Sequence, residues 1–174
     1  MKKRNVFWAL CFLAVFLVVS FVLIPISPAS EYQTLYAEDT SQPTEEVILA
    51  TMVNNVRNAN SVENLCYIED SILSQIAKLR AQDMINRCYF SHYTPEGTTF
   101  LTLMKSFGIN KKYRGENLAR IRPASYGTLE EIINAWMASE THRNNLLKKA
   151  YSQIGVGIEF RGEEEKIIVL LFTN

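Results

Sequence analysis

Cysteine and histidine are both scarce in this sequence. Among 174 residues there are 3 cysteines and 2 histidines. Cys11 lies in an apolar N-terminal run, which leaves Cys66 and Cys88 for the rest of the chain. At most one disulfide is therefore available to an exported domain. The alternative is two isolated thiols buried in a core, and the sequence does not contain the geometry that decides between them.

An excess of charge of one sign is also lacking. The 18 Lys and Arg residues balance 18 Asp and Glu residues. Lys2, Lys3 and Arg4 are the only charges in the first thirty residues, so removing them leaves a balance of about −3 for the remainder. A nucleic-acid-binding protein needs a basic face to displace counterions from phosphates. The charge pattern therefore argues against nucleic acid as a partner.

Several catalytic signatures are missing as well. The sequence contains neither His-Glu-x-x-His nor Gly-x-Ser-x-Gly, the local patterns of zinc proteases and α/β-hydrolases. It has no internal repeat and no low-complexity tract. The hydrophobic fraction of 48% is ample for a core, so most of the chain is expected to fold. The length allows one domain and a targeting segment.

An uncharged apolar run, residues 6–24, comes directly after the basic Met-Lys-Lys-Arg start. At about 1.5 Å per residue, a helix of this length nearly crosses a hydrocarbon core of about 30 Å. Pro25 and Pro28 then end the helix, and the basic residues before it favour a cytoplasmic N-terminus. We expect residues 1–28 to be a signal peptide or a transmembrane anchor in the cell membrane that exports the rest of the chain.

The exported part divides into a tether and a folded domain. Residues 29–43 are polar and acidic without sustained periodicity, which favours a flexible tether. Residues 44–174 have the pattern of one domain. Thr44 is placed to cap a first helix whose opening turn is acidic. Apolar periodicity and capping patterns predict further helices at residues 70–86, at residues 99–107 and from residue 128.

The end of the chain changes to the period of strands. Residues 154–160 alternate apolar residues with others that include Gly155 and Gly157, which predicts a strand with one buried face. Residues 163–165 are expected to form a solvated hairpin tip. Residues 167–172 are continuously apolar, as in a strand covered on both faces. Helices first and a hairpin last predict an α+β domain with helices packed on an antiparallel sheet.

Three polar segments carry the candidate site residues. His92 lies in the turn-rich Tyr-Phe-Ser-His-Tyr-Thr-Pro-Glu-Gly, and Glu116 lies in Arg-Gly-Glu-Asn-Leu. His142 follows the fourth helix, three residues after Ser139. These two share a helical face, so with Glu116 as orienter they form a candidate hydrolase triad. We favour the competing interpretation, in which Ser139 caps a short helix and backbone amides occupy its hydroxyl.

Four motifs succeed one another along the predicted domain. They are Phe-Ser-His, Gly-Glu-Asn-Leu-Ala, Trp-x-x-Ser-x-x-His-Arg-x-Asn-Leu-Leu and Ile-Gly-Val-Gly, at residues 90–92, 115–119, 136–147 and 154–157. In this order they resemble the bacterial branch of the CAP superfamily, which covers cysteine-rich secretory proteins, antigen 5 and pathogenesis-related group-one proteins. Each motif alone is weakly specific, but the ordered set is strongly specific. The resemblance to this module, also called the SCP domain, spans residues 47–174.

The resemblance implies a three-layer α-β-α sandwich with a central antiparallel sheet, here preceded by the N-terminal hydrophobic helix. It also implies a surface cleft in which His92, Glu116 and His142 match family positions. The eukaryotic members have an acidic residue at the position that Ser139 occupies here. The adjacent Glu140 can take the role of that acidic residue only if the helix end rotates it inward. The disulfides of the secreted eukaryotic members are missing.

The chemistry of this cleft is open in two respects. His92, His142 and Glu116 are ligand types for an open site that binds Zn²⁺ or another divalent cation. The alternative is a metal-free network in which Glu116 orients a histidine. We expect an extracytoplasmic binding or cell-envelope module, anchored or secreted, rather than an enzyme. A cell-wall, peptide or lipid ligand is expected. A hydrolase acting on peptides or cell wall, and a lipid carrier, are the alternatives.

Overall fold

The computed structural model describes residues 42–174, which form one compact unit. Within that part of the chain no helix has the length and apolar character needed to cross a membrane. The predicted signal or anchor, residues 1–28, lies outside the described residues, and so does the predicted tether up to residue 41. The expectations for both segments therefore stay predictions.

The described helices are α2 (Glu45–Ala59), α3 (Ile72–Asn86), α4 (Phe100–Ser106), α5 (Leu129–Ala138) and α6 (Glu140–Leu146). Two predicted helix starts are confirmed by their caps. The Thr44 hydroxyl accepts a hydrogen bond from the Val47 amide at the start of α2. At the start of α5, Thr128 and Glu131 form a reciprocal capping box.

Four strands form one sheet in the order β1-β3-β4-β2, with bounds β1 (Cys66–Tyr67), β2 (Arg114–Ile121), β3 (Gln153–Arg161) and β4 (Glu165–Thr173). Strand β4 pairs antiparallel with β3, which confirms the predicted C-terminal hairpin. It also pairs antiparallel with β2, a strand that residue patterning did not predict. The expectation of an antiparallel sheet is wrong for β1, which pairs parallel with β3. A strand of two residues carries no period-2 pattern, so residue patterning does not predict it.

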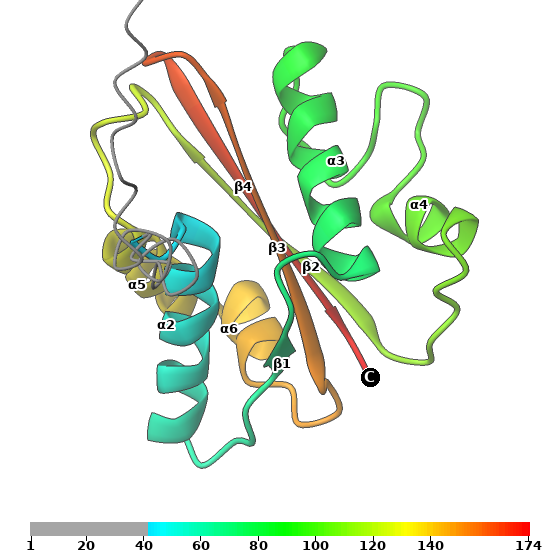
Figure 1. The fold of residues 1–174 in the computed structure, drawn as a ribbon, viewed down its shortest axis with the longest axis vertical. Helices are drawn as coiled ribbons and strands as arrows, with labels where there is room; N and C mark the ends of the chain where they lie inside the picture. The colour runs from blue at the N-terminus through cyan, green and yellow to red at the C-terminus, as the bar shows by residue number, and fades with distance from the viewer. Residues whose placement is uncertain (1–41) are drawn as a thin grey trace, which may run out of the picture. The chain divides into compact units, whose positions relative to one another are not determined.

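Helices cover both faces of this sheet (Figure 1). On one face α2, α5 and α6 share a core with residues of β3 and β4. On the other face α3 and α4 share a second core with β2 and β4. Strand β4 is buried along its whole length, which confirms the prediction of a strand covered on both faces.

The prediction that β3 has only one buried face is wrong. Gly155 and Gly157 are buried under α3, the helix that packs against β3. A Cβ atom on Gly155 would lie 2.5 Å from the Leu73 carbonyl carbon, and one on Gly157 would lie 2.3 Å from that of Ala77. The glycines are therefore the contact surface that lets the helix backbone approach the strand.

Two further expectations need correction. Within the described residues Cys66 and Cys88 are both free and exposed, so they are neither joined to each other by a disulfide nor buried in the core. Glu165, expected in a solvated hairpin tip, is only 3% exposed and begins β4. Its carboxylate contacts Arg120 of β2, Arg122 just after that strand and Arg161 of β3, and sequence spacing does not relate the first two to the tip.

Candidate functional site

Glu116 is a buried carboxylate on β2, the strand at one edge of the sheet. Its Oε1 accepts a hydrogen bond from Arg80 Nε at 3.1 Å. Its Oε2 lies 2.7 Å from Nδ1 of the His92 ring. Both oxygens therefore have partners, as burial of a carboxylate requires.

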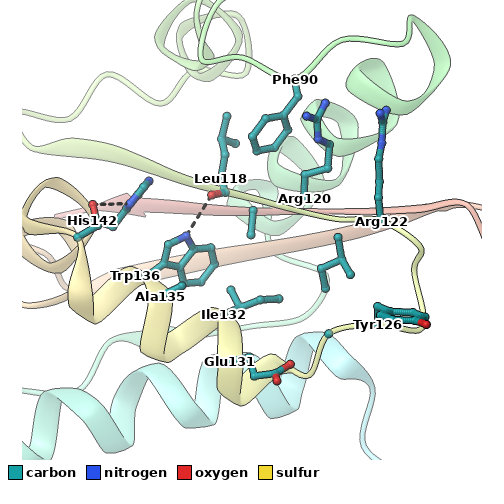
Figure 2. A pocket seen from close by; sticks show the side chains of 14 residues that line it. Phe90, Leu118, Arg120, Arg122, Tyr126, Glu131, Ile132, Ala135, Trp136 and His142 are labelled. Carbon is teal, nitrogen blue, oxygen red and sulfur yellow. Dashed lines mark hydrogen bonds between the residues drawn. The ribbon is translucent and has the colours of Figure 1, made fainter.

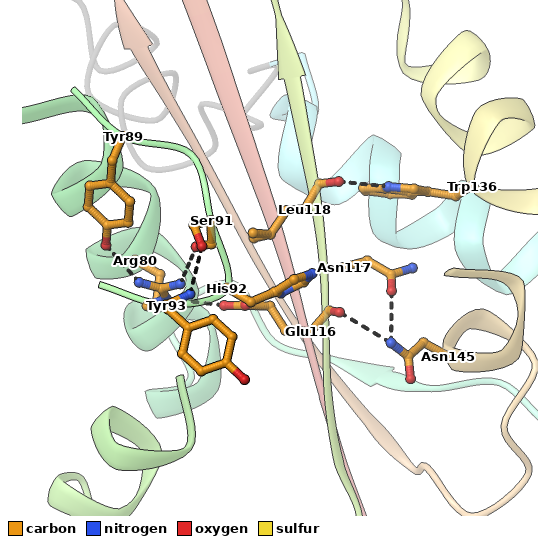
Figure 3. Close-up of polar contacts among 10 residues, drawn as sticks. All are labelled: Arg80, Tyr89, Ser91, His92, Tyr93, Glu116, Asn117, Leu118, Trp136 and Asn145. Carbon is orange, nitrogen blue, oxygen red and sulfur yellow. Dashed lines mark hydrogen bonds and ion pairs between the residues drawn. The ribbon is translucent and has the colours of Figure 1, made fainter. Parts of the chain in front are cut away.

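Arg80 comes from α3 and is only 2% exposed. Besides Glu116, its guanidinium donates to the Tyr89 hydroxyl at 2.9 Å and to the Ser91 carbonyl at 3.0 Å (Figure 3). Burial alone would lower the pKa of Arg80, but the neighbouring Glu116 and Tyr89 raise it above its usual value. Arg80 therefore stays charged and anchors the loop that carries His92.

His92 is half exposed, with 50% of its side chain accessible, although the carboxylate that holds it is buried. A carboxylate can only accept in this contact, so the neutral ring carries its proton on Nδ1 and keeps a lone pair on Nε2. The ring is fixed from the inside and presents its other nitrogen away from the carboxylate. This is the arrangement of an oriented binding group.

His142 lies in α6, and its Nδ1 is 2.9 Å from the Ser139 hydroxyl oxygen. Burial lowers the pKa of His142, and repulsion from His92 lowers it further. The second cause means that the two imidazoles lie close enough to sense each other's charge. Both causes favour the neutral form of the His142 ring.

A pair of asparagines joins His142 to Glu116. Asn145 Nδ2 donates to the Glu116 carbonyl at 3.2 Å and to Asn117 Oδ1 at 2.9 Å. Asn117 Nδ2 in turn donates to the His142 carbonyl at 3.2 Å. Gly115 makes room for this bridge, because a Cβ there would lie 2.9 Å from Asn145 Oδ1. The network thus ties β2 to α6 (Figure 3).

The predicted site residues differ in how they are placed. His92 and Glu116 are in direct contact, and His142 and Ser139 are in direct contact. His92 and Glu116 line one hollow of about 430 Å³, whereas His142 and Ser139 line the end of a larger groove of about 740 Å³. Glu140 is exposed at the start of α6, and no side-chain hydrogen bond joins it to the others within residues 42–174.

The favoured interpretation of Ser139 is wrong in one respect. Ser139 does occupy the N-cap position of α6, but its hydroxyl makes no capping hydrogen bond and contacts His142 instead. The triad of Ser139, His142 and Glu116 is not formed either, because Glu116 contacts His92. The serine and histidine form a pair, and in the described part of the chain no carboxylate bonds to the His142 ring.

The donor set fits a divalent metal poorly. Both Glu116 oxygens are engaged, and the guanidinium of Arg80 lies against one of them. Across residues 42–174 no group of three or more His, Cys, Asp or Glu side chains is placed to hold a metal ion. Two imidazoles are fewer than the three protein ligands of an open zinc site. Metal binding by His92, His142 and Glu116 remains a prediction, and the proposed function does not depend on it.

Sequence reasoning missed three members of this network, namely Arg80, Asn117 and Asn145. Arg80 carried a signal, because it lies four residues after Ile76 and four before Met84, both fully buried on the core stripe of α3. A charged residue on an apolar stripe indicates a buried partner. The asparagines lie within the motifs at residues 115–119 and 136–147, but only the structure shows their hydrogen bonds.

Residues 50–172 match the model of the cysteine-rich secretory protein family, CAP. Among curated proteins, YkwD of Bacillus subtilis (strain 168) is 43% identical over 88 residues, 51% of this chain and 33% of that protein. The membrane protein YlbC of the same organism is 25% identical over 118 residues, 68% of this chain and 32% of its own length. The chain thus spans about a third of the length of these two relatives.

Solved structures share the fold. An extracellular protein of Bacillus anthracis str. Ames that contains an SCP domain superposes with a TM-score of 0.62 at 24% identity, covering 73% of this chain and 39% of that one. An outer surface protein of Borrelia burgdorferi superposes with a TM-score of 0.64 at 22% identity, covering 73% and 90%. At these identities the likeness establishes the architecture and leaves the ligand open.

Proposed function

The chain belongs to the cysteine-rich secretory protein (CAP) family, and from this membership we propose that it is an extracytoplasmic binding module of the cell envelope. The extracellular and outer surface proteins among its structural relatives support this location. The apolar run at residues 6–24 is the segment that we expect to export the domain, as an anchor or as a cleaved signal.

The observation that carries the binding proposal is the buried Arg80–Glu116 pair beneath the half-exposed His92. Removing two charges from water costs several kcal/mol per ion, and a well-packed apolar pair of similar volume would fill the same space at no such cost. The pair fixes the loop and the ring of His92 before any ligand arrives. Preorganisation of this kind increases affinity because less order is lost on binding.

Cosedimentation with purified cell-wall sacculi tests this proposal. We expect the full-length chain to sediment with sacculi and the double variant His92→Ala, His142→Ala to lose most of that binding. The matched control is Lys105→Ala, an exposed charge on α4 without an ion pair among the described residues. Equal sedimentation of the double variant and the wild type would contradict the histidine site and leave the family membership intact.

One observation favours a hydrolase as the second candidate function. Ser139 and His142 are in contact at 2.9 Å and line the end of the larger groove, and burial lowers the pKa of His142, which favours the neutral form that a general base needs. Hydrolysis of sacculi or casein by the purified chain, abolished in a folded Ser139→Ala variant, would establish this function. Absence of turnover on both substrates would leave binding alone.

A further inference from the structure

The outer edge of β2 is only partly covered. Among the strands of residues 42–174, β4 lies on one side of β2 and no strand lies on the other. Two carbonyls on the open side have side-chain partners: Asn145 binds the Glu116 carbonyl, and Trp136 Nε1 binds the Leu118 carbonyl at 3.0 Å. In an edge strand every second residue directs its backbone N–H and C=O away from the neighbouring strand. After Glu116 and Leu118, the next such residue is Arg120. Within residues 42–174 no hydrogen bond reaches its outward N–H and C=O groups.

A groove of about 740 Å³ runs along this edge, a volume typical of a ligand site. Figure 2 shows Arg120 and Arg122 projecting on one side of β2, while Ile132, Ala135 and Trp136 of α5 lie on the other. The groove therefore has a basic wall, an apolar wall and the edge of a strand between them. Its far end is lined by Ser139 and His142 of the candidate site.

The basic wall has more positive charge than its one buried carboxylate can balance. Arg122 Nη2 lies 2.7 Å from Glu165 Oε1, Arg161 Nη1 lies 3.3 Å from Oε2, and Arg120 Nε lies 3.9 Å from Oε1. Three guanidinium groups thus share one carboxylate, which leaves a surplus of two positive charges. Arg120 and Arg122 line the groove and are 39% and 54% exposed. One carboxylate, Glu131 of α5, also lines the groove and accepts a hydrogen bond from the Thr128 amide, so positive charge still exceeds negative charge there.

We propose that this groove binds an extended peptide that adds a strand to the edge of β2. The peptide main chain pairs with the outward N–H and C=O of Arg120, the mode of recognition by strand addition. Side chains of a strand alternate between its two faces. Side chains toward Arg120 and Arg122 are acidic, and those toward Ile132, Ala135 and Trp136 are apolar. The ligand is therefore a peptide with alternating acidic and apolar residues, and this deepens the binding function proposed above.

Two other occupants fit these observations less well. Pairing of β2 with β2 of a second copy would bring the arginines of both chains together, and like charges opposite each other destabilise a strand pair. A fatty acid would use the arginines and the apolar wall, but it would leave the outward groups of Arg120 without partners. A peptide satisfies all three features of the groove.

Selection from a degenerate phage-displayed decapeptide library against the full-length chain tests the proposal. We expect enriched sequences to alternate acidic and apolar residues. A synthetic copy of the most enriched peptide should bind at least about tenfold more weakly to the Arg120→Ala, Arg122→Ala variant, because the variant loses the charge-assisted contacts of both arginines. Methylation of its main-chain nitrogens on the side that faces β2 should abolish binding. The variant Lys105→Ala, Lys149→Ala is the matched control for charge.

A second variant guards against misfolding of the arginine variant. Ala135→Glu leaves the arginine cluster intact and adds a bulky negative group to the apolar wall, so it should also weaken the peptide. No enrichment, enrichment of basic peptides, or undiminished binding to both groove variants would overturn the proposal. So would displacement of the peptide by dodecanoate together with tighter binding of dodecanoate, which would identify an acyl-chain site.

The same peptide separates this inference from the function on which it rests. If the His92→Ala, His142→Ala variant keeps the peptide but loses sacculi, the groove and the histidine site act independently and both proposals stand. If the variant keeps both ligands, the histidine site fails and the groove remains. If the arginine variants keep the peptide while the histidine variant loses sacculi, the groove inference alone fails.

Discussion

Two arginine–glutamate centres lie on either side of the edge strand's midpoint, and they differ in balance. At the first, one guanidinium meets one carboxylate, Arg80 with Glu116, and both side chains are at most 2% exposed. At the second, three guanidinium groups meet the single carboxylate of Glu165, and all three are partly exposed. The balanced centre orients a neighbouring ring, whereas the unbalanced centre keeps positive charge available for a ligand.

The largest expected effect is a difference in the stability lost when an arginine is removed from each centre. Arg80→Met leaves the Glu116 carboxylate buried without its cation, which should lower the free energy of unfolding by about 3–5 kcal/mol. Arg122→Met at the second centre should cost no more than about 1 kcal/mol, because its side chain is half exposed and two other cations remain. Urea unfolding followed by circular dichroism measures both.

A double variant sharpens this result. Arg80→Met combined with Glu116→Leu removes both charges and should recover much of the lost stability, because no unpaired charge stays buried. Sacculi binding should stay lost in this variant, since His92 no longer has its carboxylate. Equal destabilisation by Arg80→Met and Arg122→Met would contradict the difference between the two centres.

A smaller effect is expected from two glycines, one near each centre. A Cβ at Gly115 would lie 2.3 Å from the hydroxyl of Tyr151, whose buried ring stacks on Phe172. Gly115→Ala should therefore cost about 1–3 kcal/mol through overpacking. At Gly127 the nearest contact is 3.2 Å, to a side-chain methyl of Ile121. Gly127→Ala should lower the free energy of unfolding clearly less in the same assay. A larger loss for Gly127→Ala than for Gly115→Ala would contradict the tighter packing around Gly115.

The response to salt should also distinguish the centres. Glu165→Gln removes the anion shared by three arginines, and we expect a loss of about 1–2 kcal/mol at low ionic strength. Part of this loss should disappear in about 1 M NaCl, where the screening length falls to about 3 Å. The loss caused by Arg80→Met should change little with salt because that pair is buried. Urea unfolding at both salt concentrations provides the comparison.

The smallest expected effect concerns His142 and pH. Burial and the charge of His92 lower the folded-state pKa of His142 below its ordinary value of 6.5. The unfolded state therefore binds more protons, so stability is lost as the pH falls through 6.5 toward the folded-state pKa, and the penalty is absent above that range. His142→Gln should flatten this part of the pH profile. An unchanged profile would contradict the burial of this imidazole.

Much of the architecture could be predicted from the sequence because local physics determines it. The caps at Thr44 and Thr128 and the continuous apolar run of β4 depend on residues close together in the chain. The parallel pairing of β1 and the glycine face of β3 could not, since both depend on segments that meet only in the folded chain. The alternating pattern predicts that Gly155 and Gly157 lie on a solvent-exposed face of β3. In the structure α3 packs on that face, because the glycines have no side chains to keep it away.

The site was predictable in part for the same reason. The motifs supplied His92, Glu116 and His142, but not the partners that determine what each does. Arg80 lies 36 residues before Glu116 and donates hydrogen bonds both to the Glu116 carboxylate and to the Ser91 carbonyl in the loop of His92. The contact of Ser139 with His142 replaces the expected cap. Which hydrogen bond a polar side chain makes depends on competing partners, and spacing along the chain does not rank them.

The most direct test of the central claim is the protonation of the His92 ring, measured by long-range ¹H–¹⁵N correlation spectroscopy. The chain has only 2 histidines, so His142→Gln assigns both sets of signals. If the buried Glu116 holds the ring, neutral His92 carries its proton on Nδ1 and keeps Nε2 unprotonated. Signals of the Nε2–H tautomer, or an average of the two tautomers as in free imidazole, would contradict the account.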